Sequence, residues 1–572
     1  MNLEDIKTFF GALLSFDDEY PLLFTQFYFW VFFAIVFAGF ALLRNKTLLR
    51  NTYLFFVSLF FYYKTSGLFV LLLLFTTLVC FFTGRAIDKT ERAVKRKIWL
   101  AVGVVVNLLV LFYFKYAYFF TEVYNSLMRT DIEVVNHLAL WANSFSGKDI
   151  FDADKILLPV GISFYTFQSI SYIIDVYRRK MSHITNIFNF GFYVSFFPGL
   201  VAGPIIRANQ FVPQLYKKFF LTKRQFGIAI FWILNGLLKK IILSDYLAVN
   251  FVDRVFDNPD LFTAFENLSA LLCYSLQVYA DFSGYTDIAI GVAMLMGFYL
   301  PLNFNSPYKA VNPGEFWRRW HISLSTWLKD YLYIPLGGNR KGKLRTNVNL
   351  MTTMLLGGLW HGASWNFVIW GGLNGIGILL YKWWRNVKKL PRAITSTLVF
   401  VIFIVLQTFM PSPLFMIGVV WSGVFLVGVL IDWIYRSCLK LKPILWLDRG
   451  WAIFQTFIFI SFTRLFFRSG SNLDPAEANA KAWDTAKKMV SQIGGTWDVE
   501  IIPDIVSSYS SVFILFVLGM IIHWLPVKWK QWYRLQFACL PTPVMLVVCV
   551  VAVLLVYQFV TADMQPFIYF QF

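Results

Sequence analysis

Charged residues are scarce in this sequence, and their shortage excludes an ordinary water-soluble protein. Asp, Glu, Lys and Arg make up 15% of the 572 residues, whereas hydrophobic residues make up 58%. Soluble domains carry about 25% charged residues, so this chain has too little polar surface to cover a core in water. It contains instead many apolar runs of roughly 18 to 25 residues, each long enough to cross a bilayer core about 30 Å thick. Because backbone groups in lipid must be satisfied internally, these runs predict an all-α polytopic membrane protein rather than a barrel.

The chain also lacks the usual patterns of metal and nucleophile sites. Its five cysteines are scattered and form no CxxC pair, which indicates neither a disulfide framework nor a zinc site. No HExxH, GxSxG or P-loop motif occurs. The net charge of +19 could suggest nucleic acid as a partner. The basic residues cluster in short loops between apolar runs, however, where the positive-inside rule explains them more simply, so no nucleic-acid partner is expected.

These basic loops predict the topology. The strongest is GRAIDKTERAVKRK, residues 84–97, which we place in the cytoplasm. The chain is expected to start outside, with a short hairpin after its first crossing. The expected crossings include residues 22–43, 98–120, 156–175, 225–251, 394–410, 414–431, 452–467, 505–522 and 544–559. With this assignment every basic loop lies on one side, both termini lie outside, and about eleven or more spans are expected.

Residues 268–300 do not fit a plain crossing. They are long for one span and are interrupted by ADFSGYTD, which predicts one crossing plus a short broken or re-entrant piece. Asp281 and Asp287 are interpreted as caps of this helix break, since a carboxylate at membrane depth needs a partner. They could instead line a polar path or pair with Arg318 or Arg319.

A second irregular segment is residues 188–204, which has basic residues on both flanks. Its stretch FFPGLVAGP, residues 196–204, contains two prolines and two glycines, and such backbone is expected at membrane depth only inside protein or around a wet cavity. No inverted repeat of the kind found in many transporters occurs along the chain. A single membrane domain over residues 1–572 is therefore predicted.

His321 lies in NPGEFWRRWHISLSTWLKDYLYIPLGG, residues 312–338. Asn312 followed by Pro313, with Glu315 in the first turn, indicates a helix start. On a helical wheel one face is apolar and the opposite face is polar: Phe316, Trp320, Leu324, Trp327 and Tyr331 against Arg318, Arg319, Ser325, Thr326, Lys329 and Asp330. The pattern predicts an amphipathic helix on the cytoplasmic surface, with His321 at the edge of its apolar face. There the ring either reaches a lipid headgroup or serves a function, and its position leaves both open.

His361 lies in LLGGLWHGASWNFVIWGG, residues 355–372, between two basic loops assigned to the cytoplasm. Residues 349–381 are therefore predicted to form an in-and-out hairpin or a re-entrant pair. Ionisable residues within membrane segments usually face an interior or a cavity, which favours a functional role for His361; the alternative is a structural histidine bonded to a neighbouring carbonyl. Nearby small residues allow close backbone approach or leave room for a ligand: Gly357, Gly358, Gly362 and Ala363. Of the other histidines, His183 is interpreted as solvated, and His137 and His523 as interfacial.

Two histidines without a metal motif suit acyl transfer. One imidazole can act as general base on a hydroxyl that attacks an activated acyl group. The other could donate to the developing oxyanion or orient the donor. An acyl thioester with an anionic carrier would arrive from the cytoplasm, where nearby basic residues would attract it: Arg318, Arg319, Arg340, Lys341 and Lys343.

Taken in order along the chain, several segments resemble the membrane-bound O-acyltransferase (MBOAT) family. EFWRRWHISLSTWLKDYLYIPLGGNR followed by GGLWHGASWNFVIWG carries most of the resemblance. LPVGISFYTFQSISYIIDVYR, FFPGLVAGPIIR, YADFSGYTDIAIGVAMLMGF and the tail QPFIYFQF add to it. The similarity is greatest to the branch that contains the membrane subunit of alginate O-acetylation and the D-alanyl transfer protein of teichoic acids. The core of the resemblance covers residues 158–377.

The resemblance implies a fold and a set of site residues. The fold would be an MBOAT-like helical bundle with short or re-entrant helices and a central tunnel. His361 would be the family histidine and His321 the second histidine of this branch, both catalytic. Substrate binding is expected from Trp317, Arg318, Arg319, Trp360 and Asp281, with no metal and no bound cofactor.

The resemblance also implies an O-acetyltransferase of the bacterial inner membrane. It would take an acyl group from a cytoplasmic thioester, acetyl-CoA or another, and move it across the membrane for O-acetylation of an exported polysaccharide such as alginate. Membrane lipids and a periplasmic or extracellular SGNH or serine-hydrolase-like acetyltransferase are the expected partners. Within the family, the alternative acceptor is a lipid, a teichoic acid or a peptide. From another class, the alternative is a proton-coupled transporter, against which the lack of repeats and the amphipathic helix with His321 both argue.

Overall fold

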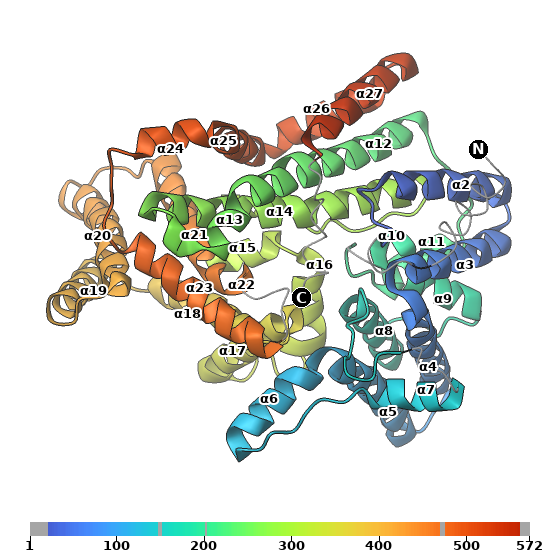
Figure 1. The fold of residues 1–572 in the computed structure, drawn as a ribbon. Helices are drawn as coiled ribbons and strands as arrows, with labels where there is room; N and C mark the ends of the chain where they lie inside the picture. The colour runs from blue at the N-terminus through green and yellow to red at the C-terminus, as the bar shows by residue number, and fades with distance from the viewer. Residues whose placement is uncertain (1–15, 17–20, 147–150, 201–202, 469–474, 561–572) are drawn as a thin grey trace. The chain divides into compact units, whose positions relative to one another are not determined.

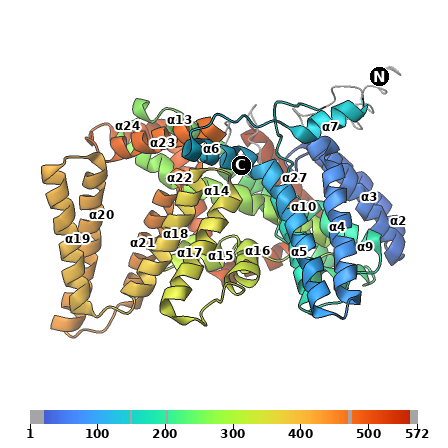
Figure 2. The ribbon, with the colours of Figure 1, turned by 90° about the horizontal axis from the view of Figure 1, so that it is seen from below.

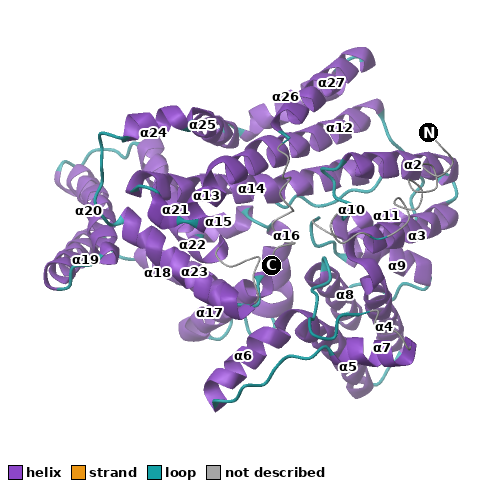
Figure 3. Ribbon diagram, viewed as in Figure 1, coloured by secondary structure: helices purple, strands orange, loops and turns teal. Residues whose placement is uncertain are grey.

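The computed structural model describes residues 16, 21–146, 151–200, 203–468 and 475–560. Within these ranges the regular elements are all helices and no strand occurs (Figure 3). This confirms the predicted all-α class. The two chain ends, whose sidedness the basic loops predict, and the tail QPFIYFQF lie outside the described residues.

Seven helical stretches among the described residues are long and apolar enough to cross a membrane. They are Thr47–Lys89, Ala93–Met128, Lys223–Asp257, Lys389–Phe409, Pro413–Cys438, Leu445–Arg468 and Thr542–Phe559. The pair Ile502–Ser508 and Ser510–Trp524 passes the same test but bends by 84°, which makes up to eight. The chain is therefore a multi-pass membrane protein, as predicted, and most of the predicted crossings overlap one of these stretches. The larger total of spans and their orientation stay predictions.

The chain divides into two compact units. The first unit comprises residues 1–237, 284–302 and 531–554, and Figure 1 shows its early helices in blue and teal. In it α4 packs against α5 and α8, and α3 packs against α9. Its helices are α2 (Phe27–Leu43), α3 (Thr47–Ser66), η1 (Gly67–Phe69), α4 (Val70–Lys89), α5 (Ala93–Leu111), η2 (Phe112–Tyr116), α6 (Ala117–Met128), α7 (His137–Ser146), α8 (Ile162–Tyr177), α9 (Ile187–Ser195), α10 (Phe197–Leu200), α11 (Ala208–Leu215) and α12 (Lys223–Leu237).

The segment 188–204, where it is described, has the irregular backbone that its prolines and glycines predict. Two short helices, α9 and α10, take the place of a crossing. Residues 189–200 are buried, which agrees with the rule that such backbone persists in a membrane only inside protein.

The second unit comprises residues 238–283, 303–530 and 555–572. Its elements begin with η3 (Leu238–Asp245), η4 (Ala248–Val252), α13 (Asp253–Asp257), η5 (Pro259–Leu261), η6 (Pro307–Lys309), α15 (Pro313–Arg319), α16 (Ile322–Leu328), η7 (Lys329–Tyr333), α17 (Gly342–His361) and α18 (Trp365–Trp384). They continue with α19 (Lys389–Phe409), α20 (Pro413–Trp433), η8 (Ile434–Cys438), α21 (Leu445–Thr463), α22 (Leu465–Arg468), α23 (Pro475–Ile493), α24 (Ile502–Ser508) and α25 (Ser510–Trp524). Helices α14 (Ala264–Leu295), α26 (Val527–Cys539) and α27 (Thr542–Phe559) each contribute residues to both units.

The predicted break in residues 268–300 is wrong. Helix α14 runs without interruption from Ala264 to Leu295, through Ser283 and Gly284. A glycine inside a helix costs only about 1 kcal/mol, whereas each backbone group left unsatisfied in lipid costs several. An uninterrupted helix therefore costs less free energy than a broken one.

Two helical hairpins belong to the second unit. Helices α17 and α18 are joined by residues 362–364 and pack along each other, which confirms the hairpin predicted for 349–381. Helices α19 and α20 form another, seen side by side in Figure 2. The α17–α18 hairpin positions the site described below.

Three histidines lie outside that site. His137 is exposed, in line with its interpretation. His183 is not simply solvated, because its Nδ1 lies 2.6 Å from Asp88 Oδ2. His523, interpreted as interfacial, is buried with 2% exposure, since its ring packs against Tyr279 and accepts a backbone hydrogen bond from Tyr308.

Candidate active site

The helix predicted to start at Asn312 is two short helices with a sharp break between them. Its beginning follows the sequence, since the Asn312 side chain accepts from the Glu315 N–H at 2.8 Å. Helix α15 nevertheless ends at Arg319, and α16 begins at Ile322. Between them His321 has left-handed backbone, with φ 42° and ψ 57°, a conformation that costs a non-glycine residue roughly 1–2 kcal/mol. The prediction of one continuous amphipathic helix is therefore wrong.

Asn303, in the preceding loop, holds this break. Its carbonyl accepts from the Ile322 N–H at 2.9 Å, and its side-chain oxygen accepts from the Ser323 N–H and hydroxyl at 3.1 and 2.9 Å. The turn moves His321 from the expected surface position to complete burial, with 0% exposure. The predicted apolar face persists across the break, because all its members are buried: Phe316, Trp320, Leu324, Trp327 and Tyr331.

His321 and His361 lie close together in the second unit. Their ring centroids are 6.2 Å apart, with the ring planes at 62°. His361 is the last residue of α17, at the tip of the hairpin, and is 2% exposed. The Trp360 ring packs against both, 5.7 Å from His321 and 5.0 Å from His361 between centroids. The two histidines that the sequence singled out thus share one site.

Further aromatic rings pack against each of the two imidazoles. Phe282 packs edge-to-face on His321 at 4.7 Å, and Trp370 and Phe467 pack on His361 at 5.0 and 5.4 Å. Burial lowers the pKa of His321 to about 3, so its ring is neutral at pH 7. A neutral imidazole has one nitrogen that can accept a proton and one N–H that can donate a hydrogen bond.

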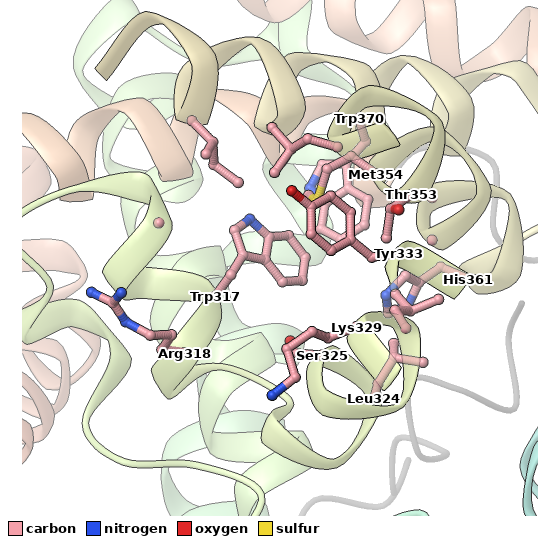
Figure 4. A pocket seen from close by; sticks show the side chains of 16 residues that line it. Trp317, Arg318, Leu324, Ser325, Lys329, Tyr333, Thr353, Met354, His361 and Trp370 are labelled. Carbon is pink, nitrogen blue, oxygen red and sulfur yellow. The ribbon is translucent and has the colours of Figure 1, made fainter. Parts of the chain in front are cut away.

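A cavity of about 300 Å³ reaches His361. Arg318 and Lys329 line it and are exposed, whereas His361 is buried, so the cavity leads from the protein surface to an imidazole. Figure 4 shows Arg318 and His361 on opposite sides of the view, with Trp317 between them. Most of the remaining wall is apolar and comes from α16, α17 and α18: Leu324, Leu328, Leu350, Met354 and Ile378. The volume lies at the lower end of the range for small-molecule sites.

Two of the predicted substrate-binding residues line this cavity, and two do not. Trp317 and Arg318 are part of its wall. Arg319 is held instead by Glu315, with its Nη2 2.7 Å from the carboxylate oxygen, and it donates to the Asn305 carbonyl at 3.0 Å. Trp360 packs on the two imidazoles without lining the cavity.

Asp281, the fifth predicted substrate-binding residue, belongs to a buried ion cluster. Lys240 Nζ lies 2.6 Å from Asp281 Oδ1 and 2.7 Å from Asp245 Oδ1, and all three side chains are buried. A buried charge needs such partners, because its desolvation costs several kcal/mol. Asp281 therefore neither caps a helix break nor lines the cavity, and in the first unit Asp287 accepts from Asn235 Nδ2 at 2.6 Å.

Sequence reasoning missed two polar residues beside the site. Asn374, 1% exposed, accepts a hydrogen bond from Trp317 Nε1 at 3.3 Å. Arg464, also 1% exposed, places its guanidinium carbon 4.3 Å from the centre of the Trp320 ring. The rule that singled out His361, a polar residue within an apolar helix, would also have found Asn374. Arg464 follows an apolar run and resembles an ordinary interfacial arginine.

The charged residues that line the cavity suit an anionic ligand. Arg318 and Lys329 can both donate to phosphate or carboxylate oxygens. Among the described residues, no three His, Cys, Asp or Glu side chains are grouped so that they could hold a metal ion. The site therefore offers two imidazoles, a cavity mouth lined by cationic side chains, and an apolar channel that leads from this mouth to His361.

Comparison with known proteins places this site within a described family model. The model of the MBOAT, membrane-bound O-acyltransferase family matches residues 177–420, a range that contains both histidines and every residue that lines the cavity.

Similar proteins act on bacterial polymers according to their names. The "Probable alginate O-acetylase AlgI" of Azotobacter vinelandii is 44% identical over 333 residues, which are 58% of this chain and 62% of that protein. The "Peptidoglycan O-acetyltransferase" of Helicobacter pylori is 34% identical over 409 residues, 66% of this chain and 74% of that protein. The "Teichoic acid D-alanyltransferase" of Bacillus subtilis is 29% identical over 250 residues, 41% of this chain and 62% of that protein. The chain thus spans about three fifths of the alginate relative and about three quarters of the peptidoglycan relative.

Proposed function

The chain belongs to the membrane-bound O-acyltransferase family, and we propose that it is an O-acetyltransferase that serves an exported polysaccharide. The observation that carries the proposal is the cavity that runs from exposed Arg318 to buried His361. An anionic acyl carrier would bind the basic mouth while its thioester reaches the imidazole. The relatives named for alginate and peptidoglycan O-acetylation support acetyl as the group and a polysaccharide as the final acceptor.

In the proposed reaction His361 acts as general base. It takes the proton of an acceptor hydroxyl while that oxygen attacks the thioester carbonyl. The new C–O bond forms, the C–S bond breaks, and the imidazolium returns the proton to the departing thiolate, so protons balance. The aromatic wall around His361, which includes Trp360 and Trp370, would keep water from competing with the acceptor.

His321 is the second catalytic residue of the proposal. Its ring does not line the cavity, but its centroid is 6.2 Å from that of His361. Being neutral at pH 7, as its low pKa dictates, it can donate its single N–H without carrying a charge into an apolar site. A donor placed this way would stabilise the oxyanion of the tetrahedral intermediate.

The donor and partners follow from the same arrangement. We expect acetyl-CoA, or another acyl thioester, as the donor substrate, and no bound cofactor. From the positive-inside assignment we infer that the cavity mouth faces the cytoplasm and that both termini lie outside. The bacterial relatives support a bacterial inner membrane as the location. A periplasmic or extracellular hydrolase-like acetyltransferase would then receive the group on the far side and transfer it to the polymer.

A different acceptor within the family is the second candidate. The peptidoglycan relative is aligned over 66% of this chain, against 58% for the alginate relative. The teichoic acid relative is named for transfer of D-alanyl rather than acetyl. Peptidoglycan, teichoic acid and lipid acceptors are therefore to be compared directly with alginate. A proton-coupled transporter is set aside, because the chain belongs to an acyltransferase family.

The test uses the purified chain in proteoliposomes with acetyl-CoA labelled in its acetyl group. Labelled acceptor is expected to form from alginate oligomers, with peptidoglycan fragments, teichoic acid and neutral lipid as parallel acceptors. Since a partner enzyme is expected to complete the transfer, the same reactions are run with membranes of a producing strain that lacks this chain. If no acceptor is labelled in either format while the protein is folded, the acetyltransferase proposal is wrong.

A further inference from the structure

A cluster of lysines gathers at the end of α25, and none of them lines the cavity. Lys530 Nζ donates to the His523 carbonyl at 2.7 Å and to the Ser306 hydroxyl at 2.9 Å. Lys309 Nζ donates to the Leu525 carbonyl at 2.6 Å. Both ammonium groups thus donate hydrogen bonds to carbonyls at the C-terminal end of α25 or in the turn that follows it.

A third cation lies beside this pair. Lys239 Nζ is 5.5 Å from the centre of the Tyr279 ring, and that ring packs against His523 at 4.6 Å. His523 adds no charge of its own, because its Nε2 accepts from the Tyr308 N–H at 3.1 Å and so carries no proton. The cluster is therefore made of ammonium groups around a neutral imidazole.

The positive charge of this cluster exceeds what the helix end can balance. Within the described part of the chain, Lys309 and Lys530 form no ion pair with a carboxylate. The carbonyls at a helix C-terminus are equivalent to about half a negative charge, whereas these two residues carry two positive charges when both are protonated. Capping of α25 explains how the ammonium groups are oriented, but it leaves most of their charge uncompensated.

Burial and repulsion from neighbouring cations both disfavour the charged form of these lysines. Burial, with the charges of Lys309 and Lys239, lowers the pKa of Lys530 to about 7. Burial and the charges of Arg319 and Arg449 lower the pKa of Lys309. An anion placed among these groups would relieve the repulsion and raise both pKa values toward their ordinary range.

The surface around the cluster resembles a membrane–water interface. Trp524 and Trp529, which flank the turn between α25 and α26, are 49% and 61% exposed. Exposed tryptophans are enriched at the level of lipid headgroups. Lys309 and Lys530 are only half-buried, so a ligand at that level can reach them.

We propose that Lys309 and Lys530 form a binding site for a phosphate group at the membrane surface, separate from the acyl-transfer site. Phosphate oxygens accept charge-assisted hydrogen bonds from ammonium groups, and one phosphate can bridge the two lysines. The same chemistry is offered by the headgroup of an anionic phospholipid and by soluble phosphate. The proposal does not depend on the acyl-transfer reaction.

The experiment compares two sources of phosphate on the full chain. In one arm the protein is placed in nanodiscs of phosphatidylcholine with or without phosphatidylglycerol, and the lipid that stays bound is measured by native mass spectrometry. In the other arm inorganic phosphate is titrated into phosphatidylcholine nanodiscs and followed by calorimetry. The variants are Lys309→Gln with Lys530→Gln, the charge-preserving Lys309→Arg with Lys530→Arg, and Lys528→Gln as control. Lys528 lies on α26, the helix that also carries Lys530, and its side chain is exposed.

The double Gln variant is expected to bind at least about tenfold more weakly in one of the two arms. The double Arg variant and Lys528→Gln should stay close to the parent. A loss confined to the phosphatidylglycerol arm identifies a lipid headgroup, and a loss confined to the other arm identifies soluble phosphate. If the double Gln variant does not fold, Lys309→Gln alone replaces it, with a smaller loss expected. Equal binding by parent and Gln variants in both arms, or an equal loss in Lys528→Gln, overturns the proposal.

Discussion

Trp317 Nε1 donates a hydrogen bond to Asn374 Oδ1 at 3.3 Å, which ties the wall of the cavity to the interior of the second unit. The Asn374 amide group donates in turn to the Trp370 carbonyl at 2.9 Å and to the Thr463 hydroxyl at 3.3 Å. Three helices, α15, α18 and α21, therefore meet at one buried amide. The orientation of the indole that borders the proposed donor channel depends on it.

Asn374→Ala is predicted to lower kcat/KM for the acyl donor by about tenfold. The substitution leaves a half-buried indole N–H without its acceptor, which costs on the order of 1–3 kcal/mol. Trp317→Phe removes that donor and keeps an aromatic wall, so Asn374→Ala should have a smaller effect when it is combined with Trp317→Phe. The release of CoA by the four proteins of this double-mutant cycle gives the measurement. Strictly additive losses would show that the two side chains are not coupled.

Arg318→Gln is predicted to raise the KM for a CoA donor several-fold with little change in kcat. Arg318 is exposed at the cavity mouth and would contact only the anionic carrier, in the ground state and transition state alike. The difference from the parent should shrink at high salt, because exposed charges are screened. Arg319→Gln is the comparison, and a smaller rise is expected because Glu315 already occupies that guanidinium. An unchanged KM in Arg318→Gln would show that the acyl donor does not bind at the cavity mouth.

Gly371→Ala is predicted to disrupt the α17–α18 hairpin. A Cβ at Gly371 would lie 2.3 Å from the Met354 carbonyl oxygen, which is backbone and cannot yield. Overpacking of this kind costs about 1–3 kcal/mol, and it would also displace His361 at the hairpin tip. At Gly372 the nearest atom is a flexible Leu355 methyl at 3.3 Å, so Gly372→Ala should stay near the parent. The measurement is the midpoint of thermal unfolding of each variant in detergent. Equal midpoints for Gly371→Ala and Gly372→Ala would contradict the close packing of α17 and α18.

His321 is predicted to make the protein less stable in mild acid. Its pKa is about 3 in the folded protein against about 6.5 in an unfolded chain. The unfolded state therefore binds the proton first, and stability is lost as the pH falls below about 6.5, by roughly 2 kcal/mol at pH 5. His321→Gln removes this contribution. Unfolding midpoints from pH 7.5 to pH 5 should fall more steeply in the parent than in His321→Gln, and parallel curves would mean that His321 is not buried as a neutral ring.

The membrane class and the hairpin around His361 could be predicted from the residues alone, because long apolar runs and basic loops on both sides of residues 349–381 are strong local signals. Ionisable side chains in apolar sequence singled out His361, but the pairing of His361 with His321 was implied only by the family resemblance. Arg318 and Trp317 were also expected near the substrate, and both line the cavity.

The features that could not be predicted depend on partners distant in the sequence. The turn at His321 is held by Asn303, which precedes α15 and carries no capping signal for α16. The continuity of α14 and the role of Asp281 depend on Lys240, a residue of another helix. A helical wheel treats its segment as isolated, so it assigned His321 to a surface edge and Asp281 to a cap.

The central claim is that His361 carries the chemistry at the inner end of the cavity. It is tested most directly by CoA release from acetyl-CoA in a single turnover, with the acceptor that the parent protein acetylates present. The comparison is between His361→Gln and His137→Gln, whose parent histidine is exposed and outside the site. We predict that His361→Gln loses at least about a hundredfold in rate, the scale of general-base catalysis, while its donor affinity and folding are retained and His137→Gln matches the parent. A His361→Gln protein that folds, binds donor and releases CoA at the parental rate would contradict the account.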